Sequence, residues 1–75
     1  MTKNRQIREM EDCLGMLFAL EDRAIHRVDK EKARDWMQQI NGALYMAARV
    51  GLLTQQERTL RTAEMRAKYV TIFGE

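Results

Sequence analysis

The apolar residues of this chain recur at intervals of three or four positions, which is the spacing of side chains on one face of a helix. No stretch alternates apolar and polar residues in the way that a strand would. The first helix is expected from about Lys3 to His26. Its apolar stripe contains Ile7, Met10, Leu14, Leu17, Ala24 and Ile25, and it is widened by Cys13, Phe18 and Leu20.

A second helix is indicated between two terminal signals. Asp29 is suited to accept hydrogen bonds from the first free amides, and Glu31 places a negative charge in the first turn. The helix is expected to end near Val50, because Gly51 is suited to the left-handed conformation that follows many helix ends. Its apolar face comprises Ala33, Trp36, Met37, Ile40, Ala43, Leu44 and Ala47.

The third helix begins with the clearest local signal of the chain. Thr54 and Glu57 have the spacing of a capping box, in which each side chain binds the backbone amide of the other residue. The following helix is expected to contain a main apolar stripe with further apolar residues partly off it. The stripe is Leu60, Ala63, Ala67 and Val70, and the residues off it are Met65, Tyr69, Ile72 and Phe73.

The short connections near residues 28–29 and 51–53 predict that neighbouring helices are antiparallel. Residues 1–75 are therefore expected to form one all-α domain, a three-helix antiparallel arrangement in which a helical hairpin is followed by a C-terminal helix. Folding the chain about its two turns sets Gly15 opposite Gly42 and Leu44 opposite Leu60. Two glycines at one level would allow a close backbone approach. Alternatively, each glycine only lowers helix stability, by roughly 1 kcal/mol.

The charge pattern and the single cysteine indicate the compartment in which the protein acts. Thirteen basic and eleven acidic residues give a net charge of +2, and both signs are interspersed between residues 21 and 35, as on a solvated helix surface. Cys13 is the only cysteine, which excludes an internal disulfide and fits a reducing compartment. The longest uncharged apolar run, residues 13–20, is far shorter than a membrane span. We expect a cytoplasmic protein without membrane contact.

The residues that catalysis requires are not combined in this chain. It has no serine, and Cys13 and His26 are placed about 140° apart around the axis of one helix. We expect Cys13 to be a small buried hydrophobic residue. The surroundings of Gly51 lack the repeated glycines and the lysine of a phosphate-binding loop. We therefore predict no enzymatic activity and no cofactor.

His26 is flanked by Asp22 and Asp29 at helical spacing, a set that superficially resembles metal ligands. The expected turn separates His26 from Asp29, and one imidazole with two carboxylates is an incomplete ligand set. A surface pair of His26 with Asp22 near the helix end explains the pattern better. No metal site is predicted.

The apolar surface is wider than three helices of this length are expected to cover. Residues 16–18, 36–37 and 44–46 are consecutive apolar groups that point in several directions on a helix, and exposed apolar patches mark interaction surfaces. We expect a homodimer that uses the third helix with the outer face of the first or second. Alternatively, Tyr69 and Phe73 simply fasten the third helix to the first two. The predicted partner-binding residues are Arg58, Arg61, Met65, Arg66, Tyr69 and Phe73.

Nucleic-acid binding is the alternative function. Ala47, Gly51 and the following Leu-Leu-Thr resemble a helix-turn-helix, but Glu57 stands where that motif needs an apolar residue. The preceding helix is also long, as in a hairpin. Several basic residues could still contact phosphates, namely Lys3, Arg5, Arg8, Arg58, Arg61 and Arg66.

Three segments, residues 4–11, 39–45 and 48–54, carry a resemblance that extends over most of the chain. With NRQIREME, QINGALY and ARVGLLT, the chain resembles the short helical proteins encoded in the early regions of lambdoid bacteriophages, including those between the exonuclease and excisionase genes. The resemblance implies a regulator that acts in the infected bacterial cytoplasm by binding host proteins, and it transfers no catalytic residue. Our prediction is a non-enzymatic protein–protein interaction module. The alternatives are a small DNA-binding accessory protein that modulates transcription and, third, a toxin or antitoxin component.

Overall fold

The computed structural model describes residues 2–74 of the chain. This part consists of three helices joined by two short turns, and it contains no strand. Helix α1 spans Thr2–His26, α2 spans Lys30–Arg49 and α3 spans Gln55–Phe73. These bounds confirm the predicted all-helical class and the predicted positions of the three helices.

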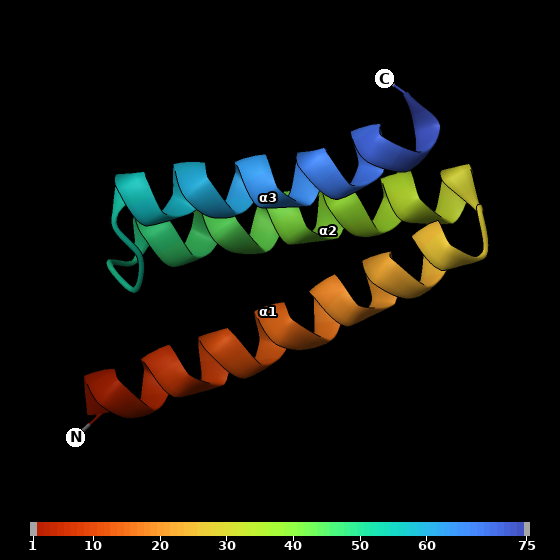
Figure 1. The fold of residues 1–75 in the computed structure, drawn as a ribbon. Helices are drawn as coiled ribbons and strands as arrows, with labels where there is room; N and C mark the ends of the chain where they lie inside the picture. Colours follow the sequence, from red (N-terminus) through yellow and green to blue (C-terminus); the bar gives the residue numbers. More distant parts are fainter. Residues whose placement is uncertain (1, 75) are drawn as a thin grey trace.

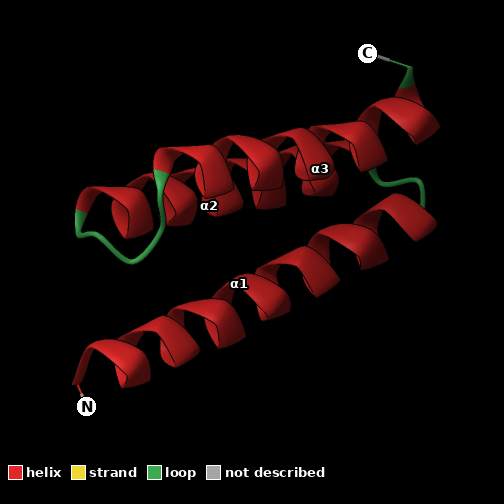
Figure 2. Ribbon diagram, turned by 60° about the vertical axis from the view of Figure 1, so that its left-hand side comes forward, coloured by secondary structure: helices red, strands yellow, loops and turns green. Residues whose placement is uncertain are grey.

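Helices α2 and α3 form an antiparallel hairpin and lie side by side in both views (Figures 1 and 2). Helix α1 runs antiparallel to α2 and packs against the hairpin. It is closest to the hairpin near the turn that leads into α2, and it diverges toward its own N-terminal end. The result is an elongated domain with extents of 41 × 20 × 14 Å.

The predicted N-terminal caps are both present. The Asp29 carboxylate accepts a hydrogen bond from the Lys32 amide at 3.1 Å. At the start of α3, the Thr54 hydroxyl accepts from the Glu57 amide at 3.1 Å, and the Glu57 carboxylate accepts from the Thr54 amide at 2.8 Å. These hydrogen bonds also lower the pKa of Glu57, because they favour its charged form. Each cap satisfies backbone donors that a helix start leaves unpaired.

The turn after α2 closes through a Schellman pair of hydrogen bonds. The Leu52 amide donates to the Ala47 carbonyl at 2.8 Å, and the Gly51 amide donates to the Ala48 carbonyl at 3.2 Å. Gly51 adopts a φ of 84°, a left-handed value that costs glycine nothing because it has no Cβ. The predicted left-handed role of Gly51 is confirmed.

The turn after α1 repeats this hydrogen-bond pattern with a different residue at its centre. The Asp29 amide donates to the Ala24 carbonyl and the Val28 amide donates to the Ile25 carbonyl, both at 2.9 Å. Val28 thus takes the place that Gly51 has in the second turn, and its φ is 54°. A β-branched residue in the left-handed region is strained. Local sequence signals did not predict this strain.

The core consists of two adjoining clusters of buried residues, and α2 contributes residues to both. One contains Leu14 from α1, Leu53 from the second turn and Met65 from α3, packed around three α2 residues, Ile40, Leu44 and Ala47. The other lies nearer the first turn and contains Ala24, Ile25, Ala33 and Tyr69. Burying a large apolar side chain contributes about 1.5–3 kcal/mol, so these few residues supply most of the stabilisation available to a domain of this size.

The buried face of α3 differs from the predicted one. Met65 and Tyr69 are buried, whereas Leu60 is 60% exposed and therefore does not pack against the fully buried Leu44. Ala63, Ala67 and Val70 are exposed as well, and with Leu60 they form an outer stripe opposite the core. Met65 and Tyr69 bring more apolar area into the core than a stripe containing two alanines can, and this difference decides which face is buried.

Cys13 is exposed, which corrects the expectation that it is a core residue. It projects from nearly the same side of α1 as the buried Ala24, three helical turns away. Ala24 packs in the core cluster nearer the first turn, whereas Cys13 belongs to neither cluster. The adjacent Leu14, about 100° around the helix axis from Cys13, is buried, so Cys13 lies at the edge of the face that α1 packs against the hairpin.

The predicted close approach of the backbones at Gly15 and Gly42 is absent. Both residues are exposed, and a Cβ placed on either one would have no heavy atom of another element within 4 Å. Each is an exposed glycine inside a helix, so the alternative interpretation, a local cost in helix stability, applies to both.

We expect Gly15→Ala and Gly42→Ala each to raise the free energy of unfolding by about 1 kcal/mol, because alanine fits the open space and restricts the unfolded chain. Equilibrium denaturation in urea measures the change. A loss of stability in either variant would show that its helix is more closely covered at this point than described.

We expect opposite effects from exchanging residue types in the two equivalent turns. Val28→Gly should stabilise the protein by about 1 kcal/mol because it relieves left-handed strain, and Gly51→Ala should destabilise it by about 1 kcal/mol because it introduces that strain. Thermal unfolding monitored by circular dichroism tests both variants. Equal changes of the same sign would contradict the conformational assignment.

Candidate functional site

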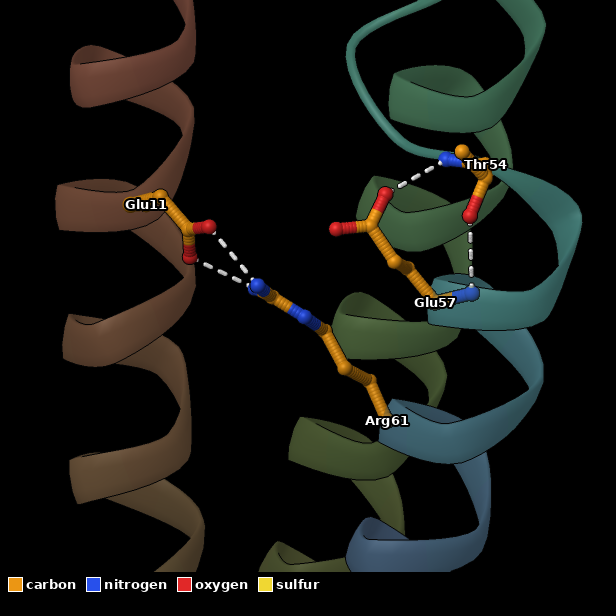
Figure 3. A network of polar contacts seen from close by, with 4 residues as sticks. All are labelled: Glu11, Thr54, Glu57 and Arg61. Carbon is orange, nitrogen blue, oxygen red and sulfur yellow. Dashed lines mark hydrogen bonds and ion pairs between the residues drawn. The ribbon is translucent and has the colours of Figure 1, made fainter.

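Helices α1 and α3 are joined by a two-armed ion pair (Figure 3). Both terminal nitrogens of the Arg61 guanidinium donate to the Glu11 carboxylate, at 2.6 and 2.7 Å. The hydrogen bond from Arg61 lowers the pKa of Glu11, and the same contact raises the pKa of Arg61. Because both side chains remain partly exposed, the pair contributes on the order of 1 kcal/mol or less. Arg61 was predicted to bind a partner, but the structure engages it within the chain.

A second polar contact between α1 and α3 involves Lys68. Its ammonium lies 3.2 Å from the Asp22 carboxylate and 5.3 Å from the centre of the Phe18 ring. The predicted side-chain pair of His26 with Asp22 is not formed. The ring Nδ1 of His26 instead lies 3.0 Å from the backbone carbonyl oxygen of Asp22, which leaves the Asp22 carboxylate to Lys68.

Glu21 is an acidic residue in the interior, and sequence analysis did not identify it. Its side chain has no exposed surface, and neither carboxylate oxygen has a hydrogen-bond partner among the described residues. Burial raises its pKa from 4.5 to about 7, the nearby Lys68 ammonium opposes this rise, and Asp22 adds to it. Its seven-residue spacing from Leu14 could have located it on the core face, where an acid is unexpected.

The six predicted partner-binding residues do not share one exposed surface. Met65 and Tyr69 are buried in the core, and the half-buried Phe73 ring lies 4.8 Å from the Tyr69 ring, tilted by 46°. Tyr69 and Phe73 therefore fasten α3 to the rest of the domain, which was the alternative interpretation. Arg66 is exposed and lies about 140° around the α3 axis from Arg61. Arg58 is half-buried, lies only about 60° from Arg61 and extends toward Tyr45 of α2. That these residues bind a partner stays a prediction.

Arg58 takes part in a contact between α2 and α3 around Tyr45. Its guanidinium carbon lies 5.6 Å from the centre of the Tyr45 ring, and one of its nitrogens donates to Gln55 at 3.2 Å. Arg49 donates to the Tyr45 hydroxyl at 3.4 Å. The half-exposed Tyr45 thus contacts two arginines, neither of which forms an ion pair with a described residue.

The same side of the hairpin contains a groove, the α2–α3 groove, with a volume of about 370 Å³. Arg34 and Arg66 lie on its two helices, and its floor includes the methionines at 37 and 65. Helix α2 contributes Arg34, Met37, Gln38 and Asn41, and α3 contributes Thr62, Met65, Arg66, Tyr69 and Val70. No carboxylate lines this groove.

The charges of the hairpin are divided between two sides. From residue 36 to residue 56 the chain has no acidic residue, and α3 carries only Glu57 and Glu64. Glu57 lies toward Arg61 (Figure 3), and Glu64 lines the space between α1 and α3. Neither of them lines the α2–α3 groove. The other side carries four arginines, called here the arginine face, and none of them forms an ion pair within residues 2–74. They are Arg34, Arg49, Arg58 and Arg66.

Exposed apolar residues are numerous, as the consecutive groups in the sequence indicated. Met16 on α1 and Tyr45 and Met46 on α2 are each close to half exposed or more. On α3 the outer stripe is exposed along its whole length, from Leu60 to Val70. The residues of this stripe are spaced by three, four and three positions, the spacing of a seam between two paired helices.

Among residues 2–74, no three His, Cys, Asp or Glu side chains are grouped so that they could hold a metal ion. None of the described helices combines the length and the apolar character needed to cross a membrane. Comparison of the chain with models of protein families, with curated proteins and with solved structures gives no match. A function is therefore inferred from the surface features described above.

We expect Glu21 to make the free energy of unfolding depend on pH. The folded-state pKa of Glu21 is raised from 4.5 to about 7, so its contribution to the free energy of unfolding is fully present below pH 4.5. This contribution is lost as the pH rises through about 7, and the free energy of unfolding falls by up to about 3 kcal/mol in total. Glu21→Gln should remove this loss and be more stable than the parent protein at pH 8. Denaturation at pH 5 and pH 8 measures the effect.

The matched control is Glu9→Gln, because Glu9 is an exposed acid of the same helix. It should leave the pH dependence almost unchanged. A Glu21→Gln variant that retained the parent's loss of stability between the two pH values would show that the Glu21 carboxyl is solvated in solution.

Proposed function

We propose that this protein is a small non-enzymatic interaction module, which binds protein partners and itself through the outer surface of its helical hairpin. The observation that carries this proposal is the outer stripe of α3, where Leu60 is 60% and Val70 44% exposed on the side opposite the core. A regular apolar stripe on an exposed helix face loses contact with water when another helix covers it.

The composition of the adjoining arginine face supports the same function. Tyr45, Arg58 and Arg66 belong to the residue types that are enriched at protein interfaces, and neither lysine nor carboxylate lines the α2–α3 groove. The resemblance to phage early proteins would make the partner a bacterial host protein and the role regulatory.

Homodimerisation belongs to this proposal. Ala63 and Ala67 lie at the middle of the outer stripe, and their small side chains would let a second helix approach closely, while Leu60 and Val70 would bury the larger apolar area at its ends. A second copy that offers the same stripe would produce a symmetric contact.

DNA binding is the second candidate, and the observation in its favour is the arginine face. Four arginines without acidic partners would attract phosphates. However, the α2–α3 hairpin is antiparallel and presents no separate recognition helix, in contrast to a helix-turn-helix. The apolar floor of the groove would have no counterpart on a phosphate backbone.

Size-exclusion chromatography with light scattering tests the dimer. We expect the parent protein to be dimeric at high micromolar concentration and Leu60→Glu to be monomeric, because the variant would bury an unpaired charge among apolar side chains in the seam. The control is Gln6→Glu, which adds the same charge at an exposed position of α1. A parent protein that is strictly monomeric at that concentration would refute the dimer.

A further inference from the structure

Two arginines line the α2–α3 groove, one on each helix. Neither Arg34 nor Arg66 makes a hydrogen bond or an ion pair with another described residue. The nearest acids along α2 are Glu31 and Asp35, which lie at the end of the groove that faces the first turn. From residue 36 to its end at Arg49, α2 carries no carboxylate. The lining of the groove therefore carries two positive charges and no negative charge.

The lining of the groove combines apolar and polar side chains, and its apolar part is adaptable. Met37 and Met65 lie between the two helices, and Val70 lies at the edge. Methionine side chains adjust to different neighbours, because they are unbranched and polarisable. A partner that contacts this floor must bring apolar side chains together with its negative charge.

The shape of the groove suits a helix. It lies between two antiparallel helices, and the part of α2 from Arg34 to Arg49 is about 22 Å long at 1.5 Å per residue. A helix that lies over two others at ordinary packing distance contacts both of them and completes a four-helix arrangement. Four turns of such a helix would span the arginine face.

We propose that the α2–α3 groove binds an acidic amphipathic helix of a partner protein, with carboxylates paired to Arg34 and Arg66 and apolar residues on Met37 and Val70. This inference rests on the proposed function and specifies the chemistry of the partner. Arginine suits the role because its planar guanidinium binds a carboxylate through two parallel hydrogen bonds. Glu31 and Asp35 would repel acids at one end, so the partner's carboxylates should be concentrated near Arg34 and further toward the second turn.

A displayed library of amphipathic helices with randomised polar positions tests the proposal on the full chain. We expect the enriched peptides to carry Asp or Glu beside an apolar stripe. The double variant Arg34→Gln/Arg66→Gln should weaken the binding of a selected peptide about tenfold, since it removes two partly exposed ion pairs. The double variant Arg8→Gln/Arg23→Gln removes the same charge from exposed positions of α1 and should bind like the parent.

Each other outcome has a separate meaning. Enriched peptides that are neutral or basic, or that bind the groove variant as well as the parent, would overturn this inference and leave the interaction function standing. A parent protein that enriches no peptide but binds duplex DNA, with that binding lost in the groove variant, would overturn this inference and assign the groove to DNA. No enrichment and no DNA binding would refute this inference as well, and in both cases the dimer measurement decides the proposed function separately.

Discussion

The packing of α2 against both of its neighbours holds this domain together. Its side chains at Ala33, Ile40 and Leu44 have no exposed surface, and each lies in a cluster that also contains residues of α1 or α3. Helices α1 and α3 contact each other less than either contacts α2, and polar pairs provide part of their contact. A buried leucine or isoleucine contributes about 1.5–3 kcal/mol, whereas a partly exposed ion pair contributes about 1 kcal/mol or less. The position of α3 and all that it presents on its outer side therefore depend on α2.

Glu21 opposes this packing. A domain of this size has a small stability margin, and an interior carboxyl without a hydrogen-bond partner consumes part of it whenever the group is charged. The strained Val28 in the first turn adds a second cost in the same region, since Ala24 and Ile25 link that turn to the core. The end of the molecule that contains the first turn thus carries energetic costs that are absent from the end where Gly51 and the Thr54 capping box lie.

Local signals predicted the helices because those signals act within a few residues. The Asp29 cap, the Gly51 turn and the Thr54–Glu57 capping box each depend on neighbours in the chain, and all three are present. Which face of α3 is buried depends on distant residues, so spacing alone chose Leu60 in place of Met65. The exposure of Cys13 likewise depends on which face of α1 the hairpin covers, which no short segment encodes. The groove could be anticipated only in part, because Arg66 was singled out whereas its counterpart Arg34 was not.

The division of charge across the hairpin gives the molecule an electrical asymmetry at right angles to its helices. Between α1 and α3 the cations Arg61 and Lys68 are matched by carboxylates, whereas the arginine face has none. A body with such a transverse dipole rotates in the field of a charged partner before any contact is made, so a negatively charged partner would encounter the arginine face first. Counterions screen this field over about 8 Å at physiological ionic strength. The asymmetry therefore influences the rate and orientation of encounter more than the lifetime of the complex that results.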